Sequence, residues 1–343
     1  MSIERTPHTF TVVITTEHEE ESLVRLLEAV CAQSLPADRY DVLVVDYSEE
    51  SRQAATEDFR ARTGRNVRHI RLSGAKPFEA RNAGLDNSAG DIVVFTDDDC
   101  TPGSQWLETY DRAFDDTRLG MAGGADKAPP SVRPFLLALD YVLTSFCGTG
   151  GMRGGCGTSG GSYYPRMWNM ALSKRAVDSV GGFDTSLPGA QEFDMAQRVR
   201  QAGYSVRYLP DCVVWHRRDT NLSGHWRASL KTSMGRAYAS SFYPESRRLT
   251  HAAPALAGFV ALTLALAAPK APLAMVSLTL LGGMYLGLIA GSGVHAAISL
   301  RRPFMLPVVP ALMFQQHLAH GLGFTVGFAR GLFARVQKRF RHE

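Results

Sequence analysis

The sequence is poor in cysteine, with five cysteines among 343 residues. Their number is odd, and no pair has the spacing of a metal finger or of a secreted disulfide framework. We therefore expect buried or free thiols in a reducing compartment. The N-terminus also lacks the basic and then apolar pattern of a signal peptide, so we expect the first part of the chain to stay in the cytosol.

Charged residues are missing from two long segments near the C-terminus. Residues 252–268 carry no charge, and residues 271–300 contain no Asp, Glu, Lys or Arg. A helix of about 20 residues crosses the ~30 Å apolar core of a bilayer. We therefore predict a transmembrane helical hairpin over residues 249–300, with a very apolar soluble helical domain as the alternative. The arginine pairs at 247–248 and 301–302 predict that both ends of the hairpin lie on the cytosolic side.

The chain after the hairpin is basic. From residue 249 onward, the sequence contains eight of the 37 Lys and Arg residues but only one of the 33 Asp and Glu residues. Residues 303–329 are interrupted by prolines and polar side chains, which favours an interfacial or re-entrant segment over a full span. We therefore predict that residues 301–343 form a basic, amphipathic tail on a membrane surface. Nucleic acid is not expected as a partner.

Short apolar runs alternate with helical patterns in the first half of the chain. Residues 10–14, 42–45, 67–72 and 92–95 have the composition of buried strands. This alternation predicts an α/β fold with a mostly parallel sheet flanked by helices, in a domain that covers residues 1–245. Ligands bind beyond the carboxyl ends of such strands, so the aspartates after the second and fourth strands are expected on one rim. No G-x-G-x-x-G motif opens the first helix, which argues against a dinucleotide-dependent dehydrogenase.

Glycine dominates residues 148–161. Because glycine has no side chain, this segment cannot pack a core. A plain linker is one interpretation of this segment. The other is a loop over the mouth of an active site, which the aromatic residues Tyr163, Tyr164 and Trp168 just after it favour.

Three consecutive aspartates, Asp97, Asp98 and Asp99, follow the fourth strand. Carboxylates this close repel one another unless a cation compensates, and Mg²⁺ binds through one or two carboxylates together with substrate phosphates. A solvated acidic turn is the alternative. In an extended chain Asp97 and Asp99 face the same way, and Asp98 faces the other. Solvent, a backbone turn and the nucleotide are the alternative partners of Asp98.

At these residues the sequence resembles the inverting family 2 glycosyltransferases with the GT-A fold, which carry a D-x-D motif at the end of such a strand. Further segments resemble other elements of that family in the same order, over roughly residues 9–220. The resemblance implies a nucleoside-diphosphate sugar as donor and Mg²⁺ or Mn²⁺ as cofactor. The other matching segments are residues 11–14, 44–46, 80–84, 89–91, 168–171, 181–184, 191–194 with Arg198, and 214–217.

On the donor side, the resemblance assigns Asp46 to the nucleotide base, and Asp98 also belongs to the predicted nucleotide site. Arg81 is a candidate for the diphosphate or the base, with a surface ion pair as its alternative. Lys76 is a weaker candidate of the same kind. Asp97 is predicted to contact the ribose or a metal-bound water.

The cation is assigned first to Asp99, with Asp97 and His216 as further metal ligands. Imidazole is a usable donor, and a histidine buried in the core is the alternative for His216. An inverting transfer also needs a base for the acceptor hydroxyl, and Glu192 replaces the catalytic aspartate of the family by position. Asp194 is a second catalytic candidate, for which a helix N-cap or an ion pair four residues along the helix is the alternative.

These residues and segments predict a metal-dependent, inverting glycosyltransferase at the inner (cytoplasmic) membrane, with its catalytic domain facing the cytosol. A lipid-linked or cell-surface glycan is the predicted acceptor. A processive polysaccharide synthase is one alternative, although the sequence lacks the Q-x-x-R-W signature. The other is a non-catalytic scaffold that binds sugar nucleotides, favoured by Tyr47 and Gln191 where the family has acids. The retention of Asp97, Asp99 and Glu192 argues against such a scaffold.

Overall fold

The chain divides into two compact units in the computed structural model. The first comprises residues 1–130, 158–186 and 191–219, and the second comprises residues 131–157, 187–190 and 220–343. The structure describes residues 7–17, 19–129, 133–150, 163–218, 220–247 and 249–340, with side chains as far as residue 337. The glycine-dominated segment lies mostly outside the described residues, so its two interpretations stay open.

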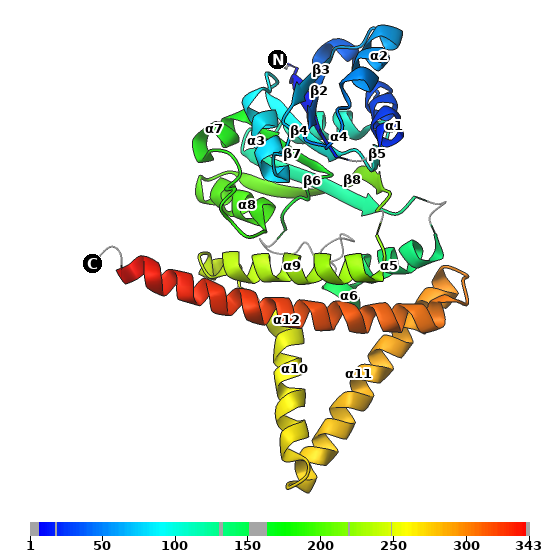
Figure 1. The fold of residues 1–343 in the computed structure, drawn as a ribbon, viewed down its shortest axis with the longest axis vertical. Helices are drawn as coiled ribbons and strands as arrows, with labels where there is room; N and C mark the ends of the chain where they lie inside the picture. The colour runs from blue at the N-terminus through cyan, green and yellow to red at the C-terminus, as the bar shows by residue number, and fades with distance from the viewer. Residues whose placement is uncertain are drawn as a thin grey trace, which may run out of the picture. The chain divides into compact units, whose positions relative to one another are not determined.

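The first unit is built on one eight-stranded sheet with the order β3-β2-β1-β4-β7-β6-β8-β5 (Figure 1). Strands β1 to β4 are parallel to one another, as the alternation in the sequence predicts, and β6 pairs in parallel with β8. Strand β7 runs antiparallel to both β4 and β6, and β5 runs antiparallel to β8. The strands are β1 (Phe10–Thr16), β2 (Tyr40–Asp46), β3 (Val67–Arg71), β4 (Ile92–Asp97), β5 (Cys100–Pro102), β6 (Leu119–Lys127), β7 (Met170–Ser173) and β8 (Ser205–His216).

Helices cover both faces of this sheet. Because successive side chains of a strand point to opposite faces, Val12 and Ile14 pack with Leu26 of α1, while Val13 faces Gly84 of α3. The α/β fold expected from the sequence is confirmed. The helical elements of the first unit are α1 (Glu20–Cys31), η1 (Ala37–Arg39), α2 (Gln53–Thr63), α3 (Pro77–Asp86), α4 (Trp106–Ala113), α7 (Lys174–Val180) and α8 (Gln191–Gln201).

The second unit is helical among its described residues. Helices α9 and α12 lie side by side, and the hairpin of α10 and α11 projects from them (Figure 1). Both hairpin helices are long and apolar enough to cross a membrane, and almost none of their surface is buried. The elements are α5 (Pro134–Thr144), α6 (Phe146–Thr149), α9 (Leu222–Ser240), η2 (Pro244–Ser246), α10 (Leu249–Ala267), α11 (Pro272–Ser299) and α12 (Met305–Phe340).

The segment after the hairpin differs from the broken one that its prolines suggested. Helix α12 runs without interruption through Pro310. Proline removes an N–H and would leave the carbonyl of Leu306 without its helical partner. Gly293 of α11 packs closely against that carbonyl and against the ring of Pro310. Tertiary packing therefore supports the helix where its own hydrogen bonding is interrupted.

A close approach of two strands at Gly124 gives a test of this architecture. A Cβ atom built on Gly124 lies 1.9 Å from the carbonyl oxygen of Cys212, at a register shift between β6 and β8. We expect Gly124→Ala to lower the free energy of unfolding by about 1–3 kcal/mol, because backbone on both sides must move. Thermal unfolding of the purified chain in detergent measures the change.

Gly103→Ala is the matched control. Its Cβ would meet only ordinary contacts, the nearest being the carbonyl oxygen of Val213 at 3.5 Å. We expect a change within about 0.5 kcal/mol. Equal stability of the two variants would contradict the β6–β8 packing described above.

Candidate functional site

The carboxyl ends of three neighbouring strands bring the predicted acids to one rim. The parallel register pairs Thr16 at the end of β1 with Asp46 at the end of β2. The same register pairs Thr15 with Asp97, the last residue of β4. The expectation that Asp46 and the aspartate triplet share a rim is therefore met by the geometry.

Asp46 is fully buried, and its carboxylate is occupied by groups of its own chain. It accepts hydrogen bonds from the backbone N–H of Arg52 at 2.7 Å and from the Arg71 guanidinium at 2.7 Å. The hydroxyl and the N–H of Ser48 also donate to it, and Nε2 of His69 lies 3.3 Å away. Burial alone would raise the pKa of Asp46, but these hydrogen bonds and the Arg71 charge lower it below its usual value. In this structure Asp46 orders the loop between β2 and α2, and its contact with a nucleotide base stays a prediction.

The three aspartates of the triplet point to three different sets of partners. Asp97 accepts hydrogen bonds from the hydroxyl of Thr15 at 3.1 Å and from Arg81 at 3.2 Å. Asp98 is buried and accepts from the hydroxyl of Thr16 at 2.5 Å and from the N–H of Glu17 at 3.2 Å. The prediction that Asp97 and Asp99 face the same way assumed an extended chain. The strand ends at Asp97, so this assumption does not hold for the two aspartates that follow.

Arg81 in α3 and Lys76, just before this helix, have different environments. The guanidinium of Arg81 lies 4.6 Å from the ring centre of Phe78 and is mostly buried beside Asp97. Lys76 precedes the helix and is exposed. The structure therefore brings Arg81, but not Lys76, into contact with the triplet.

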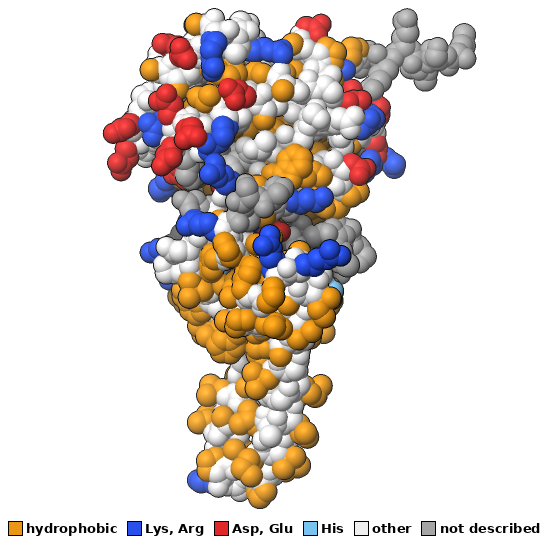
Figure 2. Space-filling model, turned by 90° about the vertical axis from the view of Figure 1, so that its right-hand side faces the viewer, with side chains coloured by type: hydrophobic (Ala, Val, Ile, Leu, Met, Phe, Trp, Pro, Cys, Tyr) orange, Lys and Arg blue, Asp and Glu red, His pale blue; other side chains and the backbone are white. Residues whose placement is uncertain are grey.

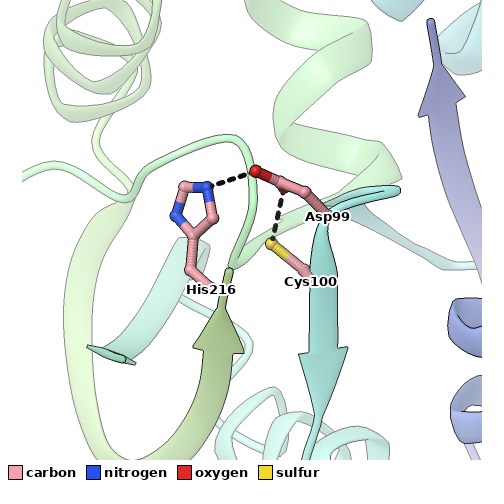
Figure 3. Close-up of side chains that lie close together, drawn as sticks. All are labelled: Asp99, Cys100 and His216. Carbon is pink, nitrogen blue, oxygen red and sulfur yellow. Dashed lines mark hydrogen bonds and ion pairs between the residues drawn. The ribbon is translucent and has the colours of Figure 1, made fainter. Parts of the chain in front are cut away.

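Asp99 lies at a candidate metal centre. Its Oδ2 is 2.9 Å from Nε2 of His216, and its Oδ1 accepts from the thiol of Cys100 at 3.4 Å (Figure 3). Antiparallel pairing of β5 with β8 aligns Cys100 with His216, which explains why the three side chains converge. One ligand atom from each lies within 4.8 Å of the others.

The charge state of this centre follows from burial and from the neighbouring carboxylates. Burial alone would lower the pKa of His216, but Asp99 and Asp126 together raise it to about 9. Burial, followed by the charge of Asp99, raises the pKa of the Cys100 thiol well above its usual range. A carboxylate suits Mg²⁺ or Mn²⁺ and an imidazole suits a transition metal, whereas a buried neutral thiol is a poor ligand, so Asp99 and His216 are the pair that could hold a cation.

The sequence did not predict a role for two residues near this centre, Cys100 and Asp126. Cys100 counted only as a buried thiol, although it directly follows the triplet. Asp126 near the end of β6 lies 3.7 Å from Nδ1 of His216 and accepts a hydrogen bond from Arg218. Asp126 does lie near a strand end, which was the signal available, but the sequence does not predict the pairing of β6 with β8.

The acids of α8 have separate environments. Asp194 is buried and accepts from Nε of Arg198 at 2.8 Å, which is the ion pair given as its alternative. Glu192 is half-buried in the first turn of the helix. Burial would lower the pKa of Arg166, but Tyr164, Glu192 and Asp126 raise it. Arg166 therefore links Glu192 electrostatically to Asp126, which lies beside His216.

Residues 11–146 match the model of glycosyl transferase family 2. The chain is 25% identical over 223 residues to glycosyltransferase AglE of Haloferax volcanii, covering 60% of this chain and 66% of that protein. It is 23% identical to the probable glycosyltransferase YdaM of Bacillus subtilis, covering 66% of this chain and 55% of that protein. The matches thus span less than two thirds of either curated relative.

A solved structure with a similar fold is a mannosyltransferase from Pyrobaculum calidifontis in complex with GDP-Man and Mn²⁺. The two chains are 18% identical and superpose with a TM-score of 0.63, over 92% of this chain and 87% of the other. At this identity the similarity establishes the GT-A-like fold.

The network around Asp46 predicts a pH dependence of stability. The ionised carboxylate stabilises the fold above the unfolded-state pKa of about 3.9, because its folded-state pKa is lower. This stabilisation is lost as the pH falls through the folded-state pKa. We expect Asp46→Asn to lower the free energy of unfolding by about 1–3 kcal/mol at pH 7. The difference from the wild type should shrink below about pH 4 in melting curves recorded against pH.

Asp58→Asn, a change at an exposed position of α2, is the control for this series. It should alter stability by less than about 0.5 kcal/mol at every pH. A constant difference between the wild type and Asp46→Asn down to pH 2 would show that the carboxylate charge does not stabilise the loop.

Proposed function

The chain carries a family 2 glycosyltransferase domain with the GT-A fold, and from this premise we propose that it is a metal-dependent, inverting glycosyltransferase. It transfers a sugar from a nucleoside-diphosphate sugar to a hydroxyl group of an acceptor. The observation that carries this proposal is the contact of Asp99, in the turn after β4, with His216 at the end of β8.

Asp99 and His216 would hold the cation. When bound there, Mg²⁺ or Mn²⁺ stabilises the negative charge that develops on the leaving diphosphate. The Pyrobaculum calidifontis mannosyltransferase was solved with GDP-Man and Mn²⁺, which makes these the first donor and cation to test here. Arg81 supplies a fixed positive charge on the same rim, because Asp97 and Phe78 restrict its guanidinium.

Glu192 is the residue proposed to accept the proton of the acceptor hydroxyl. A single displacement requires this base on the side of the sugar away from the leaving group. Asp194 holds Arg198, whose guanidinium also donates to the carbonyl oxygens of Val180 and Gly182. These contacts tie the first turn of α8 to the loop after α7, so Asp194 keeps Glu192 in place instead of reacting itself.

The hairpin, proposed to span residues 249–300, anchors the enzyme in a membrane. Hydrophobic side chains cover much of the hairpin and the adjoining surface of the second unit (Figure 2). Arg247 before the hairpin and Arg301 and Arg302 after it are exposed, which supports a cytosolic location of both ends. The catalytic unit then faces the cytosol at the inner membrane, where a lipid-linked or cell-surface glycan precursor is the acceptor.

Helix α12, in the basic tail proposed to comprise residues 301–343, lies along the bilayer surface. One face packs on α9 through glycines that admit its backbone closely, at positions 323, 327 and 331. A different face exposes apolar side chains at helical spacing, among them Phe314, Leu318, Leu322 and Phe333. Arg330 and Arg335 are exposed at the margins of this apolar face. An apolar face with basic margins suits an interface with anionic headgroups.

The catalytic assignment is tested by Glu192→Gln and Asp99→Asn. We expect Glu192→Gln to lower kcat by about 10²–10⁴-fold, because the general base is lost while donor contacts remain. Asp99→Asn should abolish Mn²⁺-dependent transfer. Release of nucleoside diphosphate from a panel of sugar nucleotides, with and without membrane lipid acceptors, measures both effects.

The control is Glu57→Gln at an exposed position of α2, which should leave turnover unchanged. Wild-type rates for both Glu192→Gln and Asp99→Asn would rule out the proposed site. A wild-type enzyme that glycosylates only water-soluble molecules would rule out the membrane acceptor while leaving the transfer reaction intact.

The position of α12 is tested by spin labels in reconstituted vesicles. In a background with the native cysteines replaced by alanine, labels at Leu318→Cys and Phe333→Cys should be more accessible to oxygen than to a water-soluble nickel complex. A label at Arg227→Cys, exposed on α9, should show the opposite preference. Equal accessibility at all three positions would exclude an interfacial α12.

A further inference from the structure

His216 lies between two carboxylates, one from the turn between β4 and β5 and one from β6. Its Nε2 is 2.9 Å from Oδ2 of Asp99, the proposed cation ligand. Its other ring nitrogen, Nδ1, is 3.7 Å from Oδ1 of Asp126. The ring of Trp168, whose centre is 4.6 Å from that of the imidazole, limits its rotation. The imidazole therefore has one nitrogen at the candidate cation site and the other at Asp126.

Asp126 is held in place independently of His216. The register of β6 with β8 pairs Asp126 with Val214, two residues before His216, so both side chains lie on the same face of the sheet. Asp126 is 5% exposed, and its Oδ2 accepts from Nη2 of Arg218 at 2.5 Å. One carboxylate oxygen is thus engaged by arginine while the other faces the imidazole.

We propose that Asp126 is a positioning residue that fixes the ring orientation and tautomer of His216 for cation binding. This inference rests on the proposed function, since it assumes that His216 is a cation ligand. With Nδ1–H directed at Asp126, the lone pair of Nε2 points to the cation site. Such a carboxylate behind a ligating histidine also increases the basicity of the ligand.

An asparagine at position 126 is not expected to orient His216 as Asp126 does. Asp126 has two acceptor oxygens, of which Oδ2 accepts from Nη2 of Arg218 and Oδ1 lies 3.7 Å from Nδ1 of His216. Asparagine has a single acceptor oxygen, which the charged guanidinium should take. The amide N–H₂ would then face His216 and favour the tautomer that carries its proton on Nε2. That nitrogen could no longer bind a cation.

The experiment is a titration of the full-length protein in detergent with Mn²⁺ alone, followed by the EPR signal of free Mn²⁺. We expect Asp126→Asn to weaken Mn²⁺ binding by about 10–100-fold, the usual effect of losing such a carboxylate. In the double variant Asp126→Asn with Arg218→Met, the asparagine oxygen is released to His216, and most of the affinity should return.

The matched control is Asp111→Asn. Asp111 is 4% exposed and pairs with Arg39 at 2.6 Å in the same unit, but it belongs to α4. The Asp111→Asn substitution should lower the melting temperature about as much as Asp126→Asn does, without changing the affinity for Mn²⁺. This control separates loss of a buried ion pair from loss of the histidine orientation.

The outcomes distinguish the inference from the function on which it rests. Equal Mn²⁺ affinity of the wild type and Asp126→Asn would overturn the inference alone, as would a double variant that binds Mn²⁺ no more tightly than Asp126→Asn. If Asp126→Asn does not fold, the double variant is compared with the wild type directly, and lost affinity overturns the proposal. A wild type that binds no Mn²⁺ would overturn both the inference and the metal dependence, whereas donor turnover tests the transferase activity separately.

Discussion

The constraint on which the rest of the site depends is the repulsion among three successive carboxylates at the end of one buried strand. Such a cluster can persist only if each charge has a partner of its own. Arg81 and Thr15 donate hydrogen bonds to Asp97, and Thr16 and the N–H of Glu17 donate to Asp98. His216 contacts Asp99. These partners come from three different parts of the chain, so relieving the repulsion also joins α3, β1 and β8 at the rim.

This division gives the three aspartates different chemical roles. Asp98 is used within the fold, because its buried carboxylate satisfies the hydroxyl of Thr16 and the N–H of Glu17. Asp97 restrains the guanidinium of Arg81, for which we proposed a contact with phosphate. Asp99 lies beside a histidine and a thiol at the candidate metal centre, and this grouping of possible ligands makes it the member of the triplet proposed to bind a cation. Asp46, like Asp98, is used within the fold, because its carboxylate accepts hydrogen bonds from an arginine and from two backbone N–H groups.

The second unit shows how one helix can serve two environments. Helix α12 packs a glycine face on α9 and exposes an apolar face, with arginines at the margins. Close packing explains the glycines, and the proposed contact with lipid would account for the exposed leucines and phenylalanines. The prolines near its start, which suggested a broken segment, are tolerated because α11 packs on the interrupted turn.

The strands and helices that arise from local sequence patterns are predictable from the sequence. The apolar runs predicted β1 to β4, the uncharged runs predicted two long apolar helices, and the strand-end rule predicted a common rim for Asp46 and the triplet. The burial and the hydrogen-bond partners of these acids are visible only in the folded structure, because they depend on residues distant in the chain. The pairing of β8 with β5 and β6 brings His216 to Asp99, Cys100 and Asp126 from about 90 to 117 positions away. No local pattern records such an encounter, since it follows from the order of strands in the folded sheet.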